Sequence, residues 1–161
     1  MLDFDGSSVK EGWVPPHVYR VRPTKRSGNR PADLPFYGDG LIMRRSALNP
    51  LHDVLDAYGE VLPLHTDDDV ELFVLNIRVV IDALDLERSE IETTPNTNIV
   101  SVQEHVFIES ALQGVEMFRV PLVPHNIYFS DLFVERVKAA KLKGLDFIKL
   151  WSSDESAVPN Q

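Results

Sequence analysis

Cysteine is absent from the 161-residue chain. Disulfide bonds, thiolate nucleophiles and cysteine-based zinc sites are therefore excluded. No apolar run approaches the length of a membrane span, and the N-terminal segment Met1–Gly6 is acidic rather than apolar. We therefore expect neither a signal peptide nor a membrane segment. These absences predict a soluble, cytoplasmic protein that does not engage a membrane.

Positive charge is scarce. The chain has 16 lysines and arginines against 25 aspartates and glutamates, which gives a formal net charge of -9. Direct binding to nucleic acid is not expected, because it requires cations that replace the counterions on phosphates. A negative field leaves room for a basic protein partner, although solubility alone is the simpler explanation of this charge.

Recognised catalytic and cofactor motifs are missing as well. The sequence contains no GxSxG, no phosphate-binding glycine loop, no HExxH and no dinucleotide fingerprint. The five histidines share no spacing, and His105 follows Glu104 on an expected strand, so the two side chains point to opposite faces. No cofactor is expected, and the absence of these motifs agrees with a protein that is not an enzyme.

The segment His65–Asp69 is the densest candidate for a metal or acid–base site. Oxygen-rich loops bind calcium or magnesium, but a calcium loop needs alternating ligands, a central glycine and a distal glutamate. Here the three aspartates are consecutive. A solvated acidic turn is the simpler interpretation. The alternative is a metal-dependent or small-molecule enzyme that uses His65, Asp67 and Asp69.

What the chain does contain is typical of a globular protein. Hydrophobic residues make up 43% and charged residues 25%, and the length suffices for one domain with a core. Prolines break up residues 1–36, which are predicted to form an irregular arm anchored by Trp13 and Tyr19. Residues 37–151 are predicted to form one α+β domain, followed by a flexible tail at 152–161. The arm carries a basic patch, interpreted as a solvated face, of Arg20, Arg22, Lys25, Arg26 and Arg30.

Two segments have the pattern strand, helix, strand. In the first, Leu41–Met43 precedes a helix that starts at Asn49-Pro50 and stops at Gly59, and Glu60–Leu64 follows. In the second, Ile127–Phe129 precedes a helix capped by Ser130 or Asp131, closed by Gly144 and followed by a strand over Phe147–Trp151. The apolar stripe of the second helix consists of Phe133, Val137 and Ala140.

Between these two units the sequence predicts further strands. Residues 70–81 look like a central strand, 87–98 a loop, and 99–108 and 115–120 two more strands. Asp82 and Asp85 are expected to cap the turn after the central strand, and Trp151 is expected to pack into the core. The whole predicts an α+β fold, in which two main helices pack on one mixed, mostly antiparallel sheet.

Several patches, in their order and spacing, resemble one known family. They are Trp13-Val-Pro-Pro16, Gly40-Leu-Ile-Met-Arg-Arg-Ser-Ala-Leu48, Glu60-Val-Leu-Pro-Leu64, Leu75-Asn-Ile77, Ile81-Asp-Ala-Leu-Asp85, Met117-Phe-Arg-Val-Pro121 and Gly144-Leu-Asp-Phe-Ile-Lys-Leu-Trp151. The resemblance covers about residues 13–151. It is to a bacterial immunity-protein family of polymorphic toxin systems, formerly a domain of unknown function and best represented in myxobacteria. The chain departs from the family pattern in its basic entry to the first helix.

That resemblance implies a protein of interbacterial competition that binds and neutralises a cognate toxin by occlusion. Without a signal peptide, the toxin is expected to act in the cytoplasm, and a nuclease with a basic groove suits an acidic inhibitor. The candidate toxin-binding residues are Asp67, Asp68, Asp69, Glu71, Asp85, Glu87, Glu90 and Glu92. A third hypothesis is a homo-dimer or larger regulatory homo-oligomer held by an exposed sheet edge.

Overall fold

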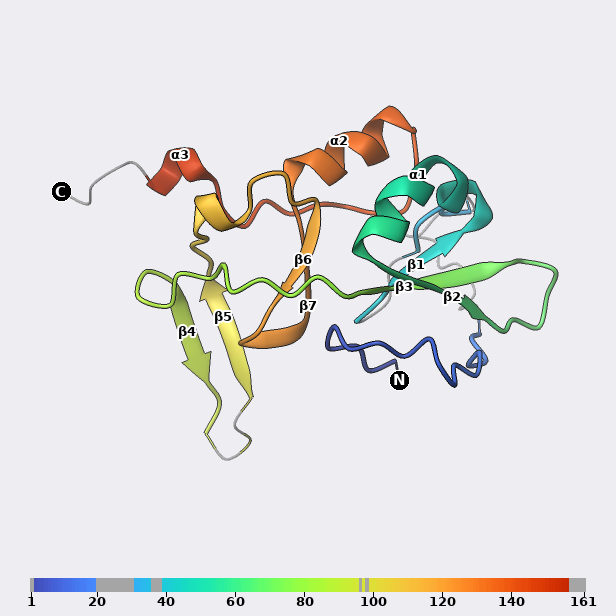
Figure 1. The fold of residues 1–161 in the computed structure, drawn as a ribbon, viewed down its shortest axis with the longest axis horizontal. Coiled ribbons are helices and arrows are strands. Elements are labelled where there is room, and N and C mark those ends of the chain that lie inside the picture. Colours follow the sequence, from blue (N-terminus) through green and yellow to red (C-terminus); the bar gives the residue numbers. More distant parts are fainter. Residues whose placement is uncertain (1, 20–30, 36–38, 96, 98, 157–161) are drawn as a thin grey trace, which may run out of the picture.

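The computed structural model describes residues 2–19, 31–35, 39–95, 97 and 99–156. Its strands are β1 (Leu41–Arg44), β2 (Gly59–Leu64), β3 (Leu72–Ile77), β4 (Glu90–Thr93), β5 (Val100–Glu104), β6 (Met117–Val120) and β7 (Val123–Phe129). The helices are α1 (Arg45–Tyr58), α2 (Asp131–Ala139), the short α3 (Ser153–Ser156) and a 3-10 turn, η1 (Glu109–Ala111). The predicted α+β class is confirmed (Figure 1).

The strands form three separate antiparallel sheets rather than one mixed sheet. Among the residues that the structure describes, β3 lies between β1 and β2, while β4 pairs only with β5 and β6 only with β7. The central strand predicted over residues 70–81 is present as β3, which ends at Ile77, four residues before the predicted end. Beyond it, the chain touches its neighbours through single bridges, Val80 to Arg119 and Leu84 to Phe107, so no continuous ladder joins the sheets.

The three-stranded sheet is buried on both faces, which explains its nearly unbroken apolar strand β3. Leu75 and Ile77 belong to the cluster under α1 and α2, together with Phe133 and Val137 of α2. Val74 alternates to the opposite face, where the cluster includes Phe4 from the N-terminal arm. Side chains alternate between the faces of a strand, so a strand covered on both sides reads as continuously apolar.

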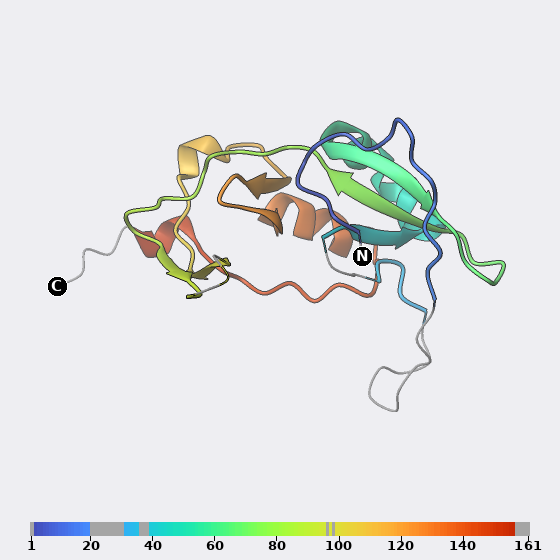
Figure 2. The ribbon, with the colours of Figure 1, turned by 90° about the horizontal axis from the view of Figure 1, so that it is seen from below.

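The arm crosses the sheet face that lies away from α1, as Figures 1 and 2 show in blue. Phe4 is only 2% exposed and fills this face. The predicted anchor Trp13 packs beside it and donates its indole N–H to the Pro63 carbonyl at 2.9 Å. The prediction that Tyr19 also anchors the arm was wrong, because this residue is 74% exposed. The basic patch of residues 20–30 lies outside the described residues.

Two polar side chains of the sheet hold the arm in place. Asn76, fully buried, donates to the Ser7 carbonyl at 2.8 Å, and the Glu60 carboxylate accepts from the Val9 amide at 3.1 Å and from the Ser8 hydroxyl. Burial raises the pKa of Glu60, but these hydrogen bonds and the charge of Arg78 outweigh it, so that its pKa lies below the usual value. The arm is therefore bound by polar as well as apolar contacts.

Residues 79–130 form the other part of the molecule, here named the β4–β7 half. Its core packs Phe107, Phe118 and Tyr128 together, with the three rings in edge and stacked contacts. Trp151 packs edge-on against Phe107 at 5.9 Å between centroids, as its core position predicted. The chain after α2 runs back along the molecule to bring Trp151 there (Figures 1 and 2).

Arg119 of β6 connects the two halves. Its side chain is fully buried, and its guanidinium donates to four backbone carbonyls, of Ile77 at 2.8 Å, Asp39 at 2.8 Å, Pro124 at 2.9 Å and His125 at 3.2 Å. Burial lowers its pKa, while the charges of Asp39 and Asp5 act in the opposite direction. The end of β3, the entry to β1 and the start of β7 therefore meet around one buried cation.

The helix ends differ from the predictions. α1 begins at Arg45, because Ala47 is already buried against the sheet, and Pro50 lies inside it rather than at its start. Ser130 does occupy the N-cap of α2, yet its hydroxyl makes no capping bond and its carbonyl accepts the first helical bonds instead. α2 ends at Ala139, and Lys141 takes the left-handed backbone conformation, with φ of 54°.

Three further predictions were wrong. Residues 87–98 are not only a loop, since β4 lies within them. Residues 147–151 pair with no strand, because they run as a connection between the two cores. Gly144, expected to close the second helix, has φ of 114° and instead lets the chain approach Leu34, whose carbonyl would lie 2.7 Å from a β-carbon there.

Candidate functional site

The predicted toxin-binding residues fall into two groups that lie far apart. The β2–β3 turn carries Asp67–Asp69 and Glu71 at one end of the long axis, whereas the chain entering β4 and β4 itself lie toward the other end (Figure 1). The sequence grouped them by charge alone. The structure does not bring them into one patch.

The first group is largely engaged in contacts within the chain. Glu71 forms a bidentate pair with Arg45, at 2.6 and 2.9 Å, and this hydrogen bonding lowers the pKa of Glu71. Asp67 lies 2.8 Å from the His17 ring nitrogen. Asp68 accepts from the Val70 amide at 3.2 Å. The predicted acidic turn is thus in part a local structural device that holds its own backbone and the arm.

The proposed enzymatic trio of His65, Asp67 and Asp69 gains no support from this geometry. All three side chains are exposed, and the open depression beside them, about 240 Å³, is lined by neither His65 nor Asp69. The His65 ring instead lies 4.9 Å from the His17 ring, next to the bridge that joins the arm to β2.

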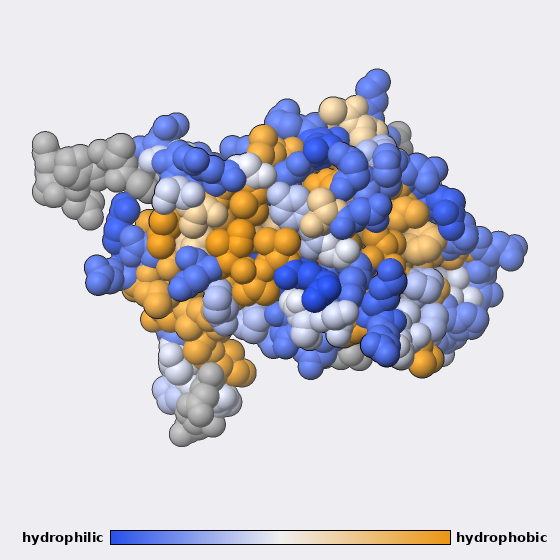
Figure 3. All heavy atoms as spheres, viewed as in Figure 1, coloured by the Kyte–Doolittle hydropathy of each residue, from blue (hydrophilic) through white to orange (hydrophobic). Residues whose placement is uncertain are grey.

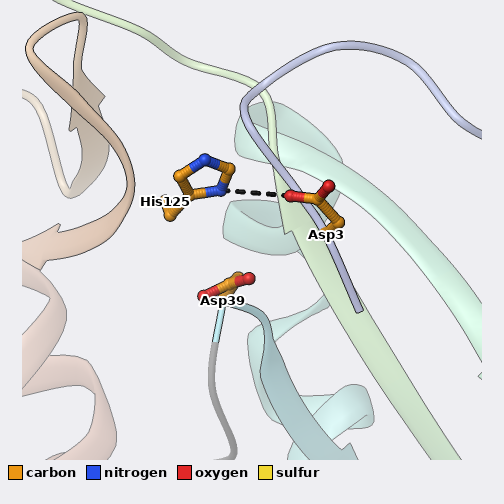
Figure 4. Close-up of side chains that lie close together, drawn as sticks. All are labelled: Asp3, Asp39 and His125. Atoms are coloured by element: carbon orange, nitrogen blue, oxygen red, sulfur yellow. Dashed lines mark ion pairs between the residues drawn. The ribbon is translucent and has the colours of Figure 1, made fainter. Parts of the chain in front are cut away.

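Within the described part of the chain, one group of three residues could hold a metal ion by distance, namely Asp3, Asp39 and His125. Figure 4 shows the Asp3 carboxylate directed at the imidazole, with the two atoms 3.3 Å apart. The Arg119 guanidinium donates to the backbone carbonyls of Asp39 and His125, so a fixed positive charge already occupies the neighbourhood. We therefore interpret the group as an ion pair between the arm and β7.

In the second group, Asp85 behaves as the predicted cap. Its Oδ1 accepts from the amides of Glu87 and Arg88, each at 3.1 Å, and its other oxygen lies 4.0 Å from the Arg88 guanidinium. Glu87 is exposed on the turn that this cap holds. The cap therefore fixes the backbone that presents Glu87 to solvent.

The other two members lie on β4, in the β4–β5 hairpin, which projects from the body in Figure 1. Glu90 pairs directly with Glu104 across the two strands, and both carboxylates are exposed. Like charges in such a position repel one another. Glu92 accepts from Gln103 at 3.1 Å on the outward face. No residue of β4 or β5 is fully buried, and the hairpin meets the core of this half through the partly buried Val100 and Val102.

Negative charge is concentrated in the β4–β7 half. This half contains eight acids, two arginines and no lysine, so it holds six of the nine net negative charges of the chain. One of the two arginines is the buried Arg119, and the other, Arg88, is paired with Asp85. Glu116 pairs with Arg136 of α2 at 2.6 Å, so the other six carboxylates give this half its negative surface.

A family model described as the immunity protein family (Imm11) matches residues 65–151. That match covers more than half of the chain and contains the whole β4–β7 half. The chain belongs to the Imm11 immunity protein family. The resemblance inferred from the sequence is confirmed over these residues. A comparison of this Imm11 protein with curated proteins finds no match.

Membership in Imm11 gives the chain an immunity function and a cognate toxin as its partner. Among the described helices of this Imm11 protein, the longest spans Arg45–Tyr58, and none is long and apolar enough to cross a membrane. The geometry therefore has to be judged as a binding surface for another protein. The β4–β7 half has the greater excess of acidic over basic residues, with six more acids than cations, whereas the β2–β3 turn has four acids.

Proposed function

We propose that the chain neutralises its cognate toxin by covering the toxin's active or substrate site, without catalysing a reaction itself. The observation that carries the proposal is the concentration of carboxylates on a half of the molecule with almost no cations. A complementary field speeds association and selects a partner of opposite sign. The family match supplies the partner class, and the charge supports a basic surface on that partner.

We further propose that the toxin acts in the cytoplasm on a polyanion, as a nuclease does. An enzyme that binds nucleic acid carries a cationic groove that matches phosphates, and an acidic protein can occupy that groove in their place. The candidate contact residues are all exposed or partly exposed, as such contacts require; they are Asp67–Asp69, Glu71, Asp85, Glu87, Glu90 and Glu92.

The test uses the cognate toxin domain, purified in a catalytically inactive form. We expect tight binding by titration calorimetry, with a dissociation constant that rises steeply with salt, because separated surface charges are screened. Reversal of Asp67–Asp69 to lysine and of Glu87, Glu90 and Glu92 to lysine, in two separate variants, then assigns the electrostatic contribution. If neither variant changes the affinity or its salt dependence, the electrostatic proposal is wrong.

A competition experiment addresses the occluded site. Fluorescently labelled nucleic acid, bound to the inactive toxin, should be displaced by the chain at stoichiometric concentration. A ternary complex of toxin, nucleic acid and chain would contradict occlusion. Light scattering of the free chain at the same concentrations shows whether it is a monomer or the homo-dimer of the alternative hypothesis.

A further inference from the structure

Large apolar side chains are exposed together on the β4–β7 half. The exposed fractions are 56% for Leu86, 42% for Ile108, 41% for Val80 and 36% for Leu122. Figure 3 shows apolar residues gathered over this part of the molecule, around the segment that leads from β3 to β4 and the neighbouring β6–β7 hairpin. A single exposed apolar residue is ordinary, whereas a gathered set on one face indicates an interaction site.

Backbone contacts place these side chains on adjacent segments. Val80 bridges to Arg119 of β6, and Leu122 lies in the turn that follows β6. On the other side of the same segment, the Ile108 amide donates to the Ala83 carbonyl at 2.8 Å. The irregular stretch 79–86 thus runs between β6 and residues 106–108. We name the four residues Val80, Leu86, Ile108 and Leu122 the apolar patch.

The charges around the patch limit what can cover it. Asp82 and Glu87 flank it within its own segment, and Glu109 follows Ile108, all three exposed. A second copy of this chain would bring the same carboxylates against these, and like charges across an interface are costly. A partner with a cationic rim around an apolar projection complements both features. Such a combination of apolar centre and charged rim is the usual anatomy of a protein interface.

We propose that the apolar patch is the central contact for the toxin and that the surrounding carboxylates are its rim. This inference rests on the proposed function and makes it specific, since it assigns the toxin to the β4–β7 half and leaves the β2–β3 turn outside the interface. The carboxylates then govern the association rate and salt dependence, while the apolar side chains govern the dissociation rate.

The first experiment compares three patch variants, Leu86→Ser, Ile108→Ser and Leu122→Ser, with a matched control. The control is Leu132→Ser on α2, whose side chain is 52% exposed and lies outside the β4–β7 half. Affinity for the inactive toxin domain is measured by calorimetry, and circular dichroism melting checks the fold of each variant. We expect at least one patch variant to bind about tenfold more weakly or worse, and the control to bind as wild type.

A charge comparison tests the rim in the same way. Glu87→Lys and Glu109→Lys should lower the association rate and flatten its salt dependence, while Glu135→Lys on α2 should not. Equal effects of rim and control variants would mean that only the overall charge matters, which would overturn the rim assignment.

A second measurement needs no variant and therefore does not depend on folding of the mutants. Hydrogen–deuterium exchange of the wild-type chain, with and without the toxin domain, should show protection in 79–88, 105–112 and 120–123. Protection confined to 65–71, or wild-type affinity in all patch variants, overturns the inference and leaves the proposed function intact. Failure of the wild-type chain to bind the toxin domain overturns the proposed function itself.

Discussion

Arg119 is the residue whose replacement should most strongly disturb the relation between the two halves. The change is Arg119→Met, which keeps most of the apolar volume and removes all hydrogen-bond donors. Four backbone carbonyls lose their partner, and the one from Ile77 lies in the fully buried part of the site. The other three carbonyls are only partly buried, so water can form hydrogen bonds to them in place of the guanidinium.

The magnitude follows from these differences. A buried carbonyl left without a donor costs about 1–3 kcal/mol, and bonds to a charged donor contribute about 1.5–3 kcal/mol each before solvent replacement. Against this, removal of the cation relieves the cost of its burial, which acts in the stabilising direction. We expect a net loss of about 3–4 kcal/mol. In a chain of this length each kcal/mol lowers the midpoint of unfolding by about 2–4 °C, so the drop should be about 10 °C.

Thermal unfolding followed by circular dichroism measures this directly. Arg119→Lys serves as the matched control, because it keeps the charge but loses the planar guanidinium. Its melting temperature should lie between those of the wild type and Arg119→Met. Toxin affinity should fall in parallel with stability, since the residue positions the β6–β7 hairpin. An Arg119→Met protein that melts within about 2 °C of wild type would refute the role given to this guanidinium.

The remaining predictions concern the arm and the C-terminal connection. Phe4→Ala should lower the free energy of unfolding by about 3 kcal/mol, measured by urea denaturation, because it leaves a cavity against the sheet; an unchanged midpoint would show that the arm is not part of the core. Glu60 has a lowered pKa. Its carboxylate therefore contributes fully to the stability of the fold above a pH of about 4.5, and this contribution is lost as the pH falls through the lower pKa of the folded state. Glu60→Gln should therefore flatten the acid limb of the stability curve, and a curve parallel to wild type contradicts this. Gly144→Ala should destabilise the chain in the same urea assay, because φ is 114° and a β-carbon would meet the Leu34 carbonyl; wild-type stability would show that the backbone relaxes.

Local patterns predicted the elements that are fixed by neighbours in sequence. Helical spacing located α2 through Phe133 and Val137, and alternation of side chains located β5. Helix ends were less accessible, because α1 extends over Ala47 for the sake of tertiary burial. The strand β4 was predicted as a loop because its residues are mostly polar and its partner β5 follows only after a turn.

Long-range arrangements could not be derived from one sequence. A single mixed sheet was expected because strand–helix–strand units usually share a sheet, but the chain after Ile77 is irregular and meets β6 only through a single bridge. Nothing in the sequence indicates that Arg119 is buried, or that Asp3 meets His125. The predicted acidic residues are divided between two ends of the molecule, and neither this division nor the apolar patch could be read from the sequence.

The most direct test of the central claim is neutralisation inside cells. Cells that express the active toxin domain in their cytoplasm should grow when the wild-type chain is co-expressed, and should stop growing when the chain carries Leu86→Ser and Ile108→Ser together. The double variant must be folded and expressed at the wild-type level, as checked by immunoblot and melting of the purified protein. Growth arrest in the presence of the wild-type chain would contradict the account, and full rescue by the double variant would contradict the surface that it assigns.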